Sequence, residues 1–368
     1  MIAALMVTAG VMAAGSRGRI RALLLVGAVG YGVAMLFALH GAPDLAVTQV
    51  LVETISLIIF VLVLRKMPRY FTNRPLTSTR WWRILVALAA GLTVTLVSII
   101  GLGSRVADPV SVDWPEPTES YGYGENIVNV ALVDIRAWDT IGEISVLVIS
   151  AVGVASLIFL RSRVGAVTNT AEAMSKRHAD LEPDTSPGVW LRGGQTLNPT
   201  VRSVVFEVVV RVLFGPMMVI SVYLLLAGHD RPGGGFAGGL VAGLALAVRY
   251  LAAGRHELAE AIPFDAGRLM GAGLGSALLA AFAPLLLSGS ILQSFQVTLA
   301  LPAFLGGELS LVSSTIFDLG VYLVVLGVVL DLMRSLGSGI DAQSDRHDAP
   351  TPVRDSAVAL PASPGGDL

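Results

Sequence analysis

About nine apolar segments, most of them close to 20 residues long, constrain the fold of this chain more than any other feature. A helix needs about 20 predominantly apolar residues to cross a bilayer, and inside it every backbone polar group must be bonded within the protein. Charged residues make up 14% of the 368 residues, against about 25% in soluble domains. The sequence therefore predicts an all-α, polytopic membrane protein with about nine transmembrane helices in two bundles. The expected spans are residues 1–15, 22–39, 45–64, 83–102, 141–160, 208–227, 235–253, 269–287 and 315–333.

A polar segment separates two groups of spans. Residues 164–200 carry charges, Pro and Gly, and cannot bury enough apolar surface to order themselves strongly. We expect a five-helix membrane domain over residues 1–163, a cytoplasmic linker over 164–200 and a four-helix membrane domain over 201–336. The tail, residues 337–368, is rich in Gly, Ser, Asp and Pro and is expected to be disordered.

Lys and Arg are concentrated in alternate loops. Residues 16–21, 65–83 and 161–202 are basic, whereas residues 103–140 are acidic. Short cytoplasmic loops carry an excess of Lys and Arg. We therefore expect a multi-pass protein of the cell membrane with its N-terminus outside and its linker and C-terminus in the cytoplasm. A cleaved signal peptide is the less favoured interpretation of the first segment, because its basic residues follow the apolar run.

The residue types also exclude several classes of function. No cysteine is present, which excludes disulfides, thiolate catalysis and cysteine–metal sites. The five histidines show no metal-ligand spacing, and no nucleophile, histidine and acid form a catalytic set. No basic patch interleaved with aromatic residues indicates nucleic-acid binding. We expect no catalytic residue, no metal, no cofactor and no nucleic-acid partner; the bilayer is the expected surrounding.

A carboxylate lies inside the third apolar segment. Glu53 is nine residues beyond Asp44, about 13.5 Å deeper along a helix, which places it near the bilayer midplane. Gln49 shares its face, and Thr48 lies beside that face. An ionisable group at this depth costs about 2.5–3.5 kcal/mol and is a functional candidate by default. All four residues are therefore candidates for an ion path. The alternative is a protonated Glu53 bonded to a neighbouring helix, with Asp44 in a cap or turn after Pro43.

Three further carboxylates are ion-path candidates. Asp139 and Glu143 are four residues apart and would share one face where the fifth span begins, placed to collect protons or cations. The alternative is that Asp139 caps the helix and pairs with Arg136. Asp318, in the outer third of the last span, is a candidate for a polar contact.

A glycine-rich turn precedes the seventh span. Its glycines permit unusual backbone angles, and the pair four residues apart in the following helix suits close helix packing in lipid. Packing is the expected role; the alternative is an irregular helix start that lines a cavity. A similar mixture of His, Gly, Pro and Asp occurs at residues 40–44. The expected turn and packing residues are His40, Pro43, Gly233, Gly234, Gly235, Phe236, Gly239 and Gly243.

Three stretches together resemble one family. Residues 40–53 are similar to the C-terminal region of MrpA, the large subunit of the multisubunit Mrp-type cation/proton antiporters. Residues 124–143 resemble the segment that follows it, which in related membrane-bound hydrogenases is a separate small subunit. Residues 202–334 resemble MrpB, in the Pro-Gly-Gly-Gly-Phe turn at 232–236 and the Phe-Asp-Leu-Gly-Val-Tyr-Leu segment at 317–323. Some bacteria fuse MrpA to MrpB in this order.

The resemblance implies a subunit of a Na⁺/H⁺ antiporter that supplies part of a transmembrane ion path. Asp44 and Glu53 would take part in it, and Glu143 more weakly. The implied partners are other Mrp subunits, including an upstream antiporter-like MrpA module related to the pumping subunits of respiratory complex I. That module is absent from this sequence, and the short first span is what a chain that starts inside MrpA would show. Two alternatives stay open: a membrane-arm subunit of a hydrogenase-like or complex I-like redox-driven ion pump, and a scaffold with a buried, protonated Glu53.

Overall fold

The computed structural model describes residues 1–64, 67–71, 77–104, 106–159, 190–191, 193, 202–287, 290–300 and 308–348. Within these ranges, eight helices are long and apolar enough to cross a membrane, and a shorter apolar helix, α1 (Ile2–Gly15), precedes them. The predicted all-α polytopic fold is therefore confirmed. The long helices are α2 (Arg19–Leu39), α3 (Pro43–Leu64), α4 (Thr77–Gly103), α7 (Ala137–Phe159), α9 (Val204–Ala227), α10 (Gly234–Ala261), α11 (Ala266–Phe282) and α13 (Ser314–Asp348).

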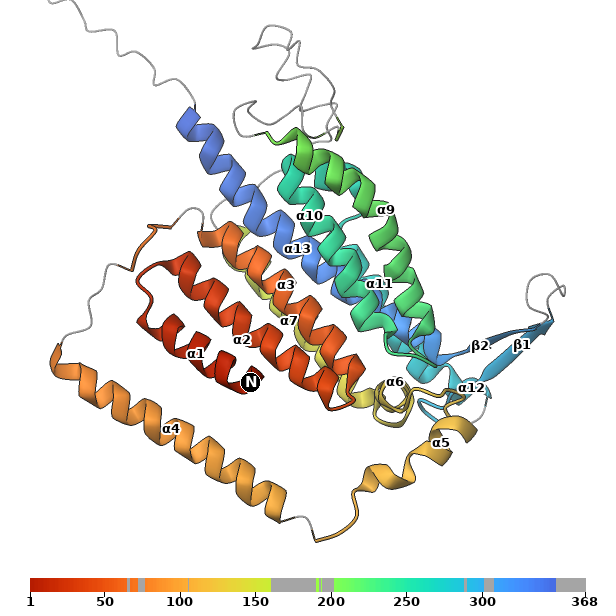
Figure 1. Cartoon of the computed structure of the whole chain (residues 1–368). Coiled ribbons are helices and arrows are strands. Elements are labelled where there is room, and N and C mark those ends of the chain that lie inside the picture. The colour runs from red at the N-terminus through yellow and green to blue at the C-terminus, as the bar shows by residue number, and fades with distance from the viewer. Residues whose placement is uncertain are drawn as a thin grey trace, which may run out of the picture.

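Helix α13 lies at the centre of the molecule and joins the two groups of helices (Figure 1). It packs on α10 and α11 of the second group and on α7 of the first, while α3 packs on α10. A continuous hydrophobic core runs through these contacts, from Ile55 of α3 through Ile144 of α7 to Phe317 and Leu330 of α13. The two expected groups are therefore in direct contact.

Small residues allow α10 and α13 to approach closely. A methyl group added at Gly239 would lie 2.9 Å from the backbone oxygen of Tyr322, and one added at Gly243 would lie 2.9 Å from the Val329 side chain. In lipid, helices associate by such packing because lipid chains are as apolar as the helix surfaces. The glycine pair in α10 thus faces α13.

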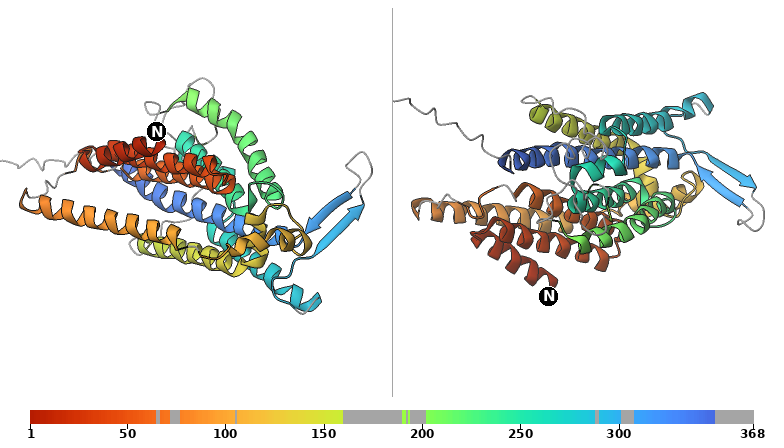
Figure 2. Two further views of the ribbon diagram at one scale, coloured as in Figure 1. Left: turned by 60° about the horizontal axis from the view of Figure 1, so that its bottom comes forward. Right: turned by 90° about the horizontal axis from the view of Figure 1, so that it is seen from above.

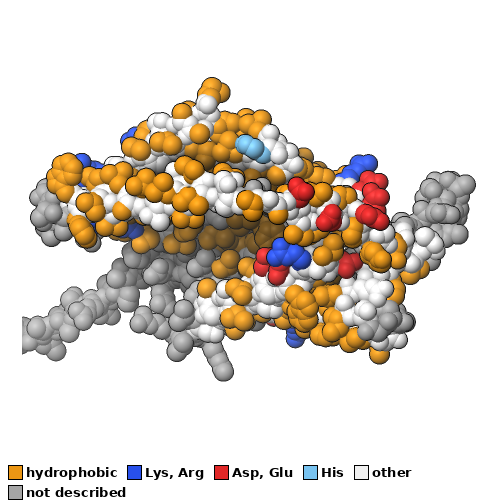
Figure 3. Space-filling model, turned by 90° about the horizontal axis from the view of Figure 1, so that it is seen from below, with side chains coloured by type: hydrophobic (Ala, Val, Ile, Leu, Met, Phe, Trp, Pro, Cys, Tyr) orange, Lys and Arg blue, Asp and Glu red, His pale blue; other side chains and the backbone are white. Residues whose placement is uncertain are grey.

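Helix α4 lies apart from all other helices (Figure 1). None of its described residues is buried, including Trp81 and Trp82 near its beginning. We expected α4 to pack within the first bundle. The other long helices of this group do pack, on one another or on the second group, but α4 does not. The face seen in Figure 3 is largely hydrophobic, with acidic side chains gathered toward one end of the molecule.

Short elements connect the long helices at the end of the molecule where α10 and α13 begin. A 3₁₀ turn (Val110–Asp113), α5 (Pro115–Ser120), α6 (Ile127–Val130) and a π-helical turn (Ala131–Ile135) lead from α4 to α7. The short α12 (Pro284–Leu287) follows α11, and an antiparallel hairpin of β1 (Gln296–Ala300) and β2 (Glu308–Val312) leads into α13. The hairpin projects from the body (Figures 1 and 2).

Two regions differ from the expectation or extend it. The segment between the expected spans 269–287 and 315–333 was assigned no regular structure from the sequence, but residues 296–299 alternate polar and apolar, which is the pattern of a strand. The tail was expected to be disordered from residue 337, but α13 continues to Asp348, since the first helix-breaking proline is Pro350. Residues 349–368 and residues 164–189 of the expected linker lie outside the described part of the chain.

Candidate functional site

The first turn of α3 is bonded to the glycine turn before α10. Asp44 lies in that first turn, and its carboxylate oxygen Oδ1 accepts a hydrogen bond from the backbone N–H of Gly233 at 3.0 Å. The same oxygen accepts a longer bond, 3.4 Å, from the side-chain amide of Asn126. The turn at residues 40–44 and the turn at 228–234 therefore lie together. His40, which follows α2, is exposed, and among the described residues its ring bonds only to the Leu36 carbonyl of that helix.

Asn126 holds the connection to α7 against the same turn. Its amide nitrogen donates to the backbone oxygens of Gly228 and Arg231, each at 3.0 Å. Its side-chain oxygen caps α6 by accepting from the backbone N–H groups of Val128 and Asn129. One side chain thus satisfies a helix end and two carbonyls of a segment about a hundred residues away.

Asp318 is buried between α10 and α13, with 5% of its surface exposed. Its carboxylate accepts from the backbone N–H of Gly235 at 3.1 Å and from the side-chain amide of Asn129 at 3.0 Å. No cationic side chain among the described residues pairs with it. A buried carboxylate with only neutral donors is costly to keep charged. It is the most deeply buried of the predicted ion-path carboxylates.

The glycines of the turn leave no room for side chains. Gly234 has a φ of +88°, a conformation that residues with a Cβ rarely adopt, and its added methyl would press on the Asn129 amide. A methyl added to Gly235 would overlap the backbone oxygen of Asp318. These glycines allow α10 to begin directly against α13. The adjacent Phe236 is half-buried against the hydrophobic core.

Glu53 lies midway along α3 and is half-buried. Its carboxylate packs against Gly30 of α2, where an added methyl group would overlap an oxygen of Glu53. Within the described ranges, neither a hydrogen bond nor an ion pair holds this carboxylate. One residue further along α3, the hydroxyl of Thr54 bonds to Tyr31 of α2 at 2.8 Å. The interface between α2 and α3 is therefore polar at this depth.

The other predicted residues of α3 lie closer to its beginning. Gln49 is half-buried. The hydroxyl of Thr48 donates to the backbone oxygens of Asp44 and Leu45, at 2.9 and 3.1 Å, so its proton is used within its own helix. Only the lone pairs of Thr48 are left for a cation.

The carboxylates at the beginning of α7 are not drawn together. Asp139 pairs with Arg136, and both side chains are about half exposed. This is the arrangement that the sequence left open as the alternative. Glu143 is exposed. Within the described residues, neither Asp139 nor Glu143 forms a hydrogen-bonded network with Asp44, Glu53 or Asp318.

Asp134, in the π-helical turn, is a further acidic residue of this region. Burial raises the pKa of its carboxyl group, an effect that a hydrogen bond from Ser294 and the nearby His229 partly oppose. The His229 ring bonds to the backbone oxygen of Gly122 at 2.8 Å. No group of three or more His, Cys, Asp or Glu residues in the described ranges is arranged to hold a metal ion.

Asn126, Asn129 and Asp134 were not predicted as site residues. Asn126 could have been found from the sequence, because an asparagine before a short apolar run is a preferred helix cap. No local pattern marks Asn129, whose partner Asp318 is 189 residues away.

Known proteins resemble successive parts of the chain. The MbhD family of MBH subunits matches residues 4–69, the MbhE family of MBH subunits matches 78–176, and the family described as "Domain related to MnhB subunit of Na+/H+ antiporter" matches 205–331. In a structure of the Mrp complex from Dietzia sp. DQ12-45-1b, one chain is 30% identical, with a TM-score of 0.71 over 91% of this chain and 34% of that one. This chain is a relative of the Mrp antiporter subunits. The resemblance inferred from the sequence is thereby confirmed.

Two curated proteins agree with the relationship to the Mrp subunits. The probable K⁺/H⁺ antiporter A/B subunit of Rhizobium meliloti is 30% identical over 86% of this chain and 32% of its own length. The Na⁺/H⁺ antiporter A subunit of Bacillus subtilis is 37% identical over 42% of this chain and 19% of its own length. The chain therefore spans about a third or less of the curated relatives it matches.

Proposed function

We propose that this chain is a subunit of a multisubunit monovalent cation/proton antiporter, to which it contributes part of the transmembrane ion path and a helix-packing scaffold. The names of its relatives support transport rather than catalysis. The observation that carries the ion-path role is the carboxylate of Glu53, half-buried midway along α3 and without a bonding partner in the described residues.

An unpartnered carboxylate at this depth is suited to bind and release a cation. Leaving it charged and unpaired in lipid costs several kcal/mol, so it gains from taking up a proton or a Na⁺ ion. The neighbouring oxygens of Gln49 and Thr48 are neutral ligands of the kind that a hard cation accepts. Glu53 would be the exchanging site, with Asp44 and Asp318 toward the end where α10 begins and the acids of α7 at the surface.

The scaffold role is supported by the polar junction of Asp44, Asn126 and Gly233, which ties α3, the connection to α7 and α10 together. These hydrogen bonds would fix the positions of α3, α7 and α10 relative to one another beside the proposed ion path. We place this junction on the outer side and the linker and C-terminus in the cytoplasm, on the strength of the Lys and Arg distribution.

The partners that we propose are the other members of an Mrp-type complex, including an antiporter-like MrpA module. The exposed apolar surface of α4 supports this, because a helix without buried residues gains packing from neighbouring helices. The alternative of a redox-driven ion pump has less support, since the curated relatives named above are antiporter subunits.

The test is cation-dependent proton exchange in everted membrane vesicles from an antiporter-deficient host. The chain is expressed alone and together with its neighbouring genes, and the Glu53→Gln variant is compared with Glu119→Gln, a change at an exposed acid of α5. We expect exchange only with the neighbouring genes, at least a tenfold loss with Glu53→Gln and no loss with Glu119→Gln. Full exchange by Glu53→Gln in a complex that co-purifies intact would remove Glu53 from the path. Exchange by the chain alone would show that it is a self-sufficient transporter and overturn its place in a larger complex.

A further inference from the structure

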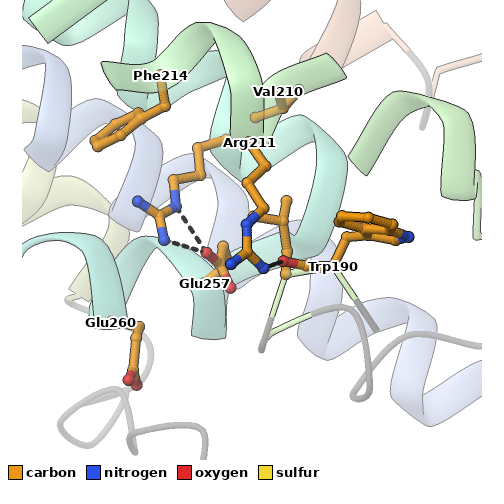
Figure 4. A pocket seen from close by; sticks show the side chains of 8 residues that line it. Trp190, Val210, Arg211, Phe214, Glu257 and Glu260 are labelled. Carbon is orange, nitrogen blue, oxygen red and sulfur yellow. Dashed lines mark hydrogen bonds and ion pairs between the residues drawn. The ribbon is translucent and has the colours of Figure 1, made fainter. Parts of the chain in front are cut away.

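A polar cavity lies toward the far end of α10 from the glycine turn, where α9 begins (Figure 4). Its volume is about 300 Å³, and α9, α10 and the described residues before α9 line it. The lining combines two arginines with aromatic rings: Arg211, Arg249, Phe214 and Trp190. None of these residues takes part in the ion path proposed above.

The charge of Arg249 is neutralised within the protein. Its Nε donates to Glu257 Oε1 at 2.7 Å, and its Nη2 lies 2.5 Å from the same oxygen. The other oxygen of Glu257 accepts a hydrogen bond from the backbone N–H of Gly193 at 2.7 Å. Both oxygens of this carboxylate, which is 1% exposed, therefore have a partner within the protein. Gly254, with a φ of +76°, breaks α10 and turns its end back toward Arg249. The Arg249 guanidinium also lies 4.6 Å from the centre of the Phe214 ring.

The charge of Arg211 is not neutralised by a carboxylate of the described residues. Its Nη1 donates to the backbone oxygen of Trp190 at 2.6 Å, and its guanidinium lies 6.0 Å from the centre of the Trp190 ring. A guanidinium has five N–H donors, so most of them are left for another acceptor. Figure 4 shows Glu260 pointing away from this group. Arg211 is therefore the lining arginine that no carboxylate of the described residues pairs, although Glu260 also lines the cavity.

The position of Arg211 along α9 places this charge near the membrane surface. Arg211 is seven residues after Val204, where α9 begins, which is about 10.5 Å at 1.5 Å per residue. Helical side chains tilt toward the N-terminus of their helix, so the guanidinium reaches back toward that surface. Trp190 is suited to the same depth. The adjacent Val212, about 100° further round α9, is exposed and presents an apolar surface beside the charge.

We propose that Arg211 and Trp190 bind the headgroup phosphate of an anionic phospholipid in this cavity. A guanidinium fork binds two phosphate oxygens at once, and basic cavities between helices are recurrent sites for anionic headgroups. The acyl chains lie along the exposed apolar surface of α9 beside Arg211, at Val212, a contact that a free phosphate ion lacks. The guanidinium of Arg211, which no carboxylate of the described residues pairs, favours a lipid with a net negative headgroup over a zwitterionic one.

Native mass spectrometry of the purified full-length chain in detergent tests this site. Phosphatidylglycerol, phosphatidylcholine and inorganic phosphate are titrated separately, and the bound fraction of each is measured. The variants are Arg211→Gln and Arg211→Lys, with Arg268→Gln as the matched control. Arg268 is an exposed arginine near the start of α11, at the same end of the bundle but outside the cavity.

We expect wild type and Arg268→Gln to retain one phosphatidylglycerol with equal affinity and to bind it more tightly than phosphatidylcholine. Arg211→Gln should bind it about tenfold more weakly, the loss of one charge-assisted contact. Arg211→Lys keeps the charge, and its affinity for phosphatidylglycerol should lie between those of wild type and Arg211→Gln. The site therefore stays testable if the glutamine variant does not fold. Equal retention by all variants overturns the site, and binding of inorganic phosphate as tight as that of the lipid overturns the lipid assignment.

Discussion

A single methyl group added at Gly235 tests the close contact between α10 and α13. The added carbon would overlap the backbone oxygen of Asp318, which cannot rotate away, so the two helices must separate. Overpacking of this kind costs about 1–3 kcal/mol. Separation also weakens the 3.1 Å bond from the Gly235 N–H to the Asp318 carboxylate, and a hydrogen bond to a charged group contributes about 1.5–3 kcal/mol. Gly235→Ala should therefore lower the free energy of unfolding by about 2.5–6 kcal/mol.

Thermal unfolding of the purified chain in detergent measures this loss. A decrease of that size should lower the melting temperature by at least about 5 °C. Gly271→Ala in α11 is the matched control, because its added methyl meets no atom within 4 Å and alanine is favoured over glycine within a helix by about 1 kcal/mol. Its melting temperature should stay equal or rise. If the two variants melt alike, the close contact of α10 and α13 does not stabilise the fold.

Three further changes test the polar junction, the acidic turn and the ion path. Asn126→Ala removes a helix cap and two bonds to the turn at 228–231, and should lower the free energy of unfolding by about 1–3 kcal/mol, measured by thermal unfolding. Burial raises the pKa of Asp134, so the folded protein binds the proton of this carboxyl group more tightly than the unfolded chain does. The protonated carboxyl group therefore stabilises the fold at pH values below its ordinary pKa of 3.8, and this stabilisation is lost as the pH rises through the pKa of the folded state. Asp134→Asn should therefore gain melting temperature relative to wild type at pH 7.5 but not at pH 3.5. Gly30→Ala should displace the Glu53 carboxylate and lower proton exchange in vesicles without changing Glu53 itself.

Each of these has its own control. Ser203→Ala removes the longer, exposed cap bond of α9 and should cost less than Asn126→Ala. For Asp134→Asn, an equal shift at both pH values would show that the effect is not a titration. For Gly30→Ala, the comparison is Gly91→Ala in α4, where an added methyl meets nothing within 4 Å of the chain. Equal exchange by the two glycine variants would contradict the close packing of Glu53 on Gly30.

The spans could be predicted from the sequence because one property determines them. A segment such as residues 45–64 must be about 20 residues long and apolar to cross a bilayer, and no other part of the chain alters that requirement. The strand pattern at 296–299 is also present in the sequence, in its alternating polar and apolar side chains.

The arrangement of the spans could not be predicted in the same way. A helix surface that faces lipid and one that faces a partner helix are both apolar, so the sequence of α4 does not reveal that it lies apart. Asp318 was identified as a polar contact, but its partner Asn129 is 189 residues away and no periodicity links the two. The Asp44 carboxylate, which a local rule assigns to its own helix end, bonds instead to a turn 189 residues further along.

The bond between Asp44 and Gly233 joins parts of the chain that match different families, residues 4–69 and 205–331. If these parts were separate polypeptides, the junction would form by collision and would weaken on dilution. In one chain it forms within the molecule, at an effective concentration that does not depend on the amount of protein in the membrane. Fusion also fixes a one-to-one ratio of the joined parts, so no complex can assemble with one of them missing.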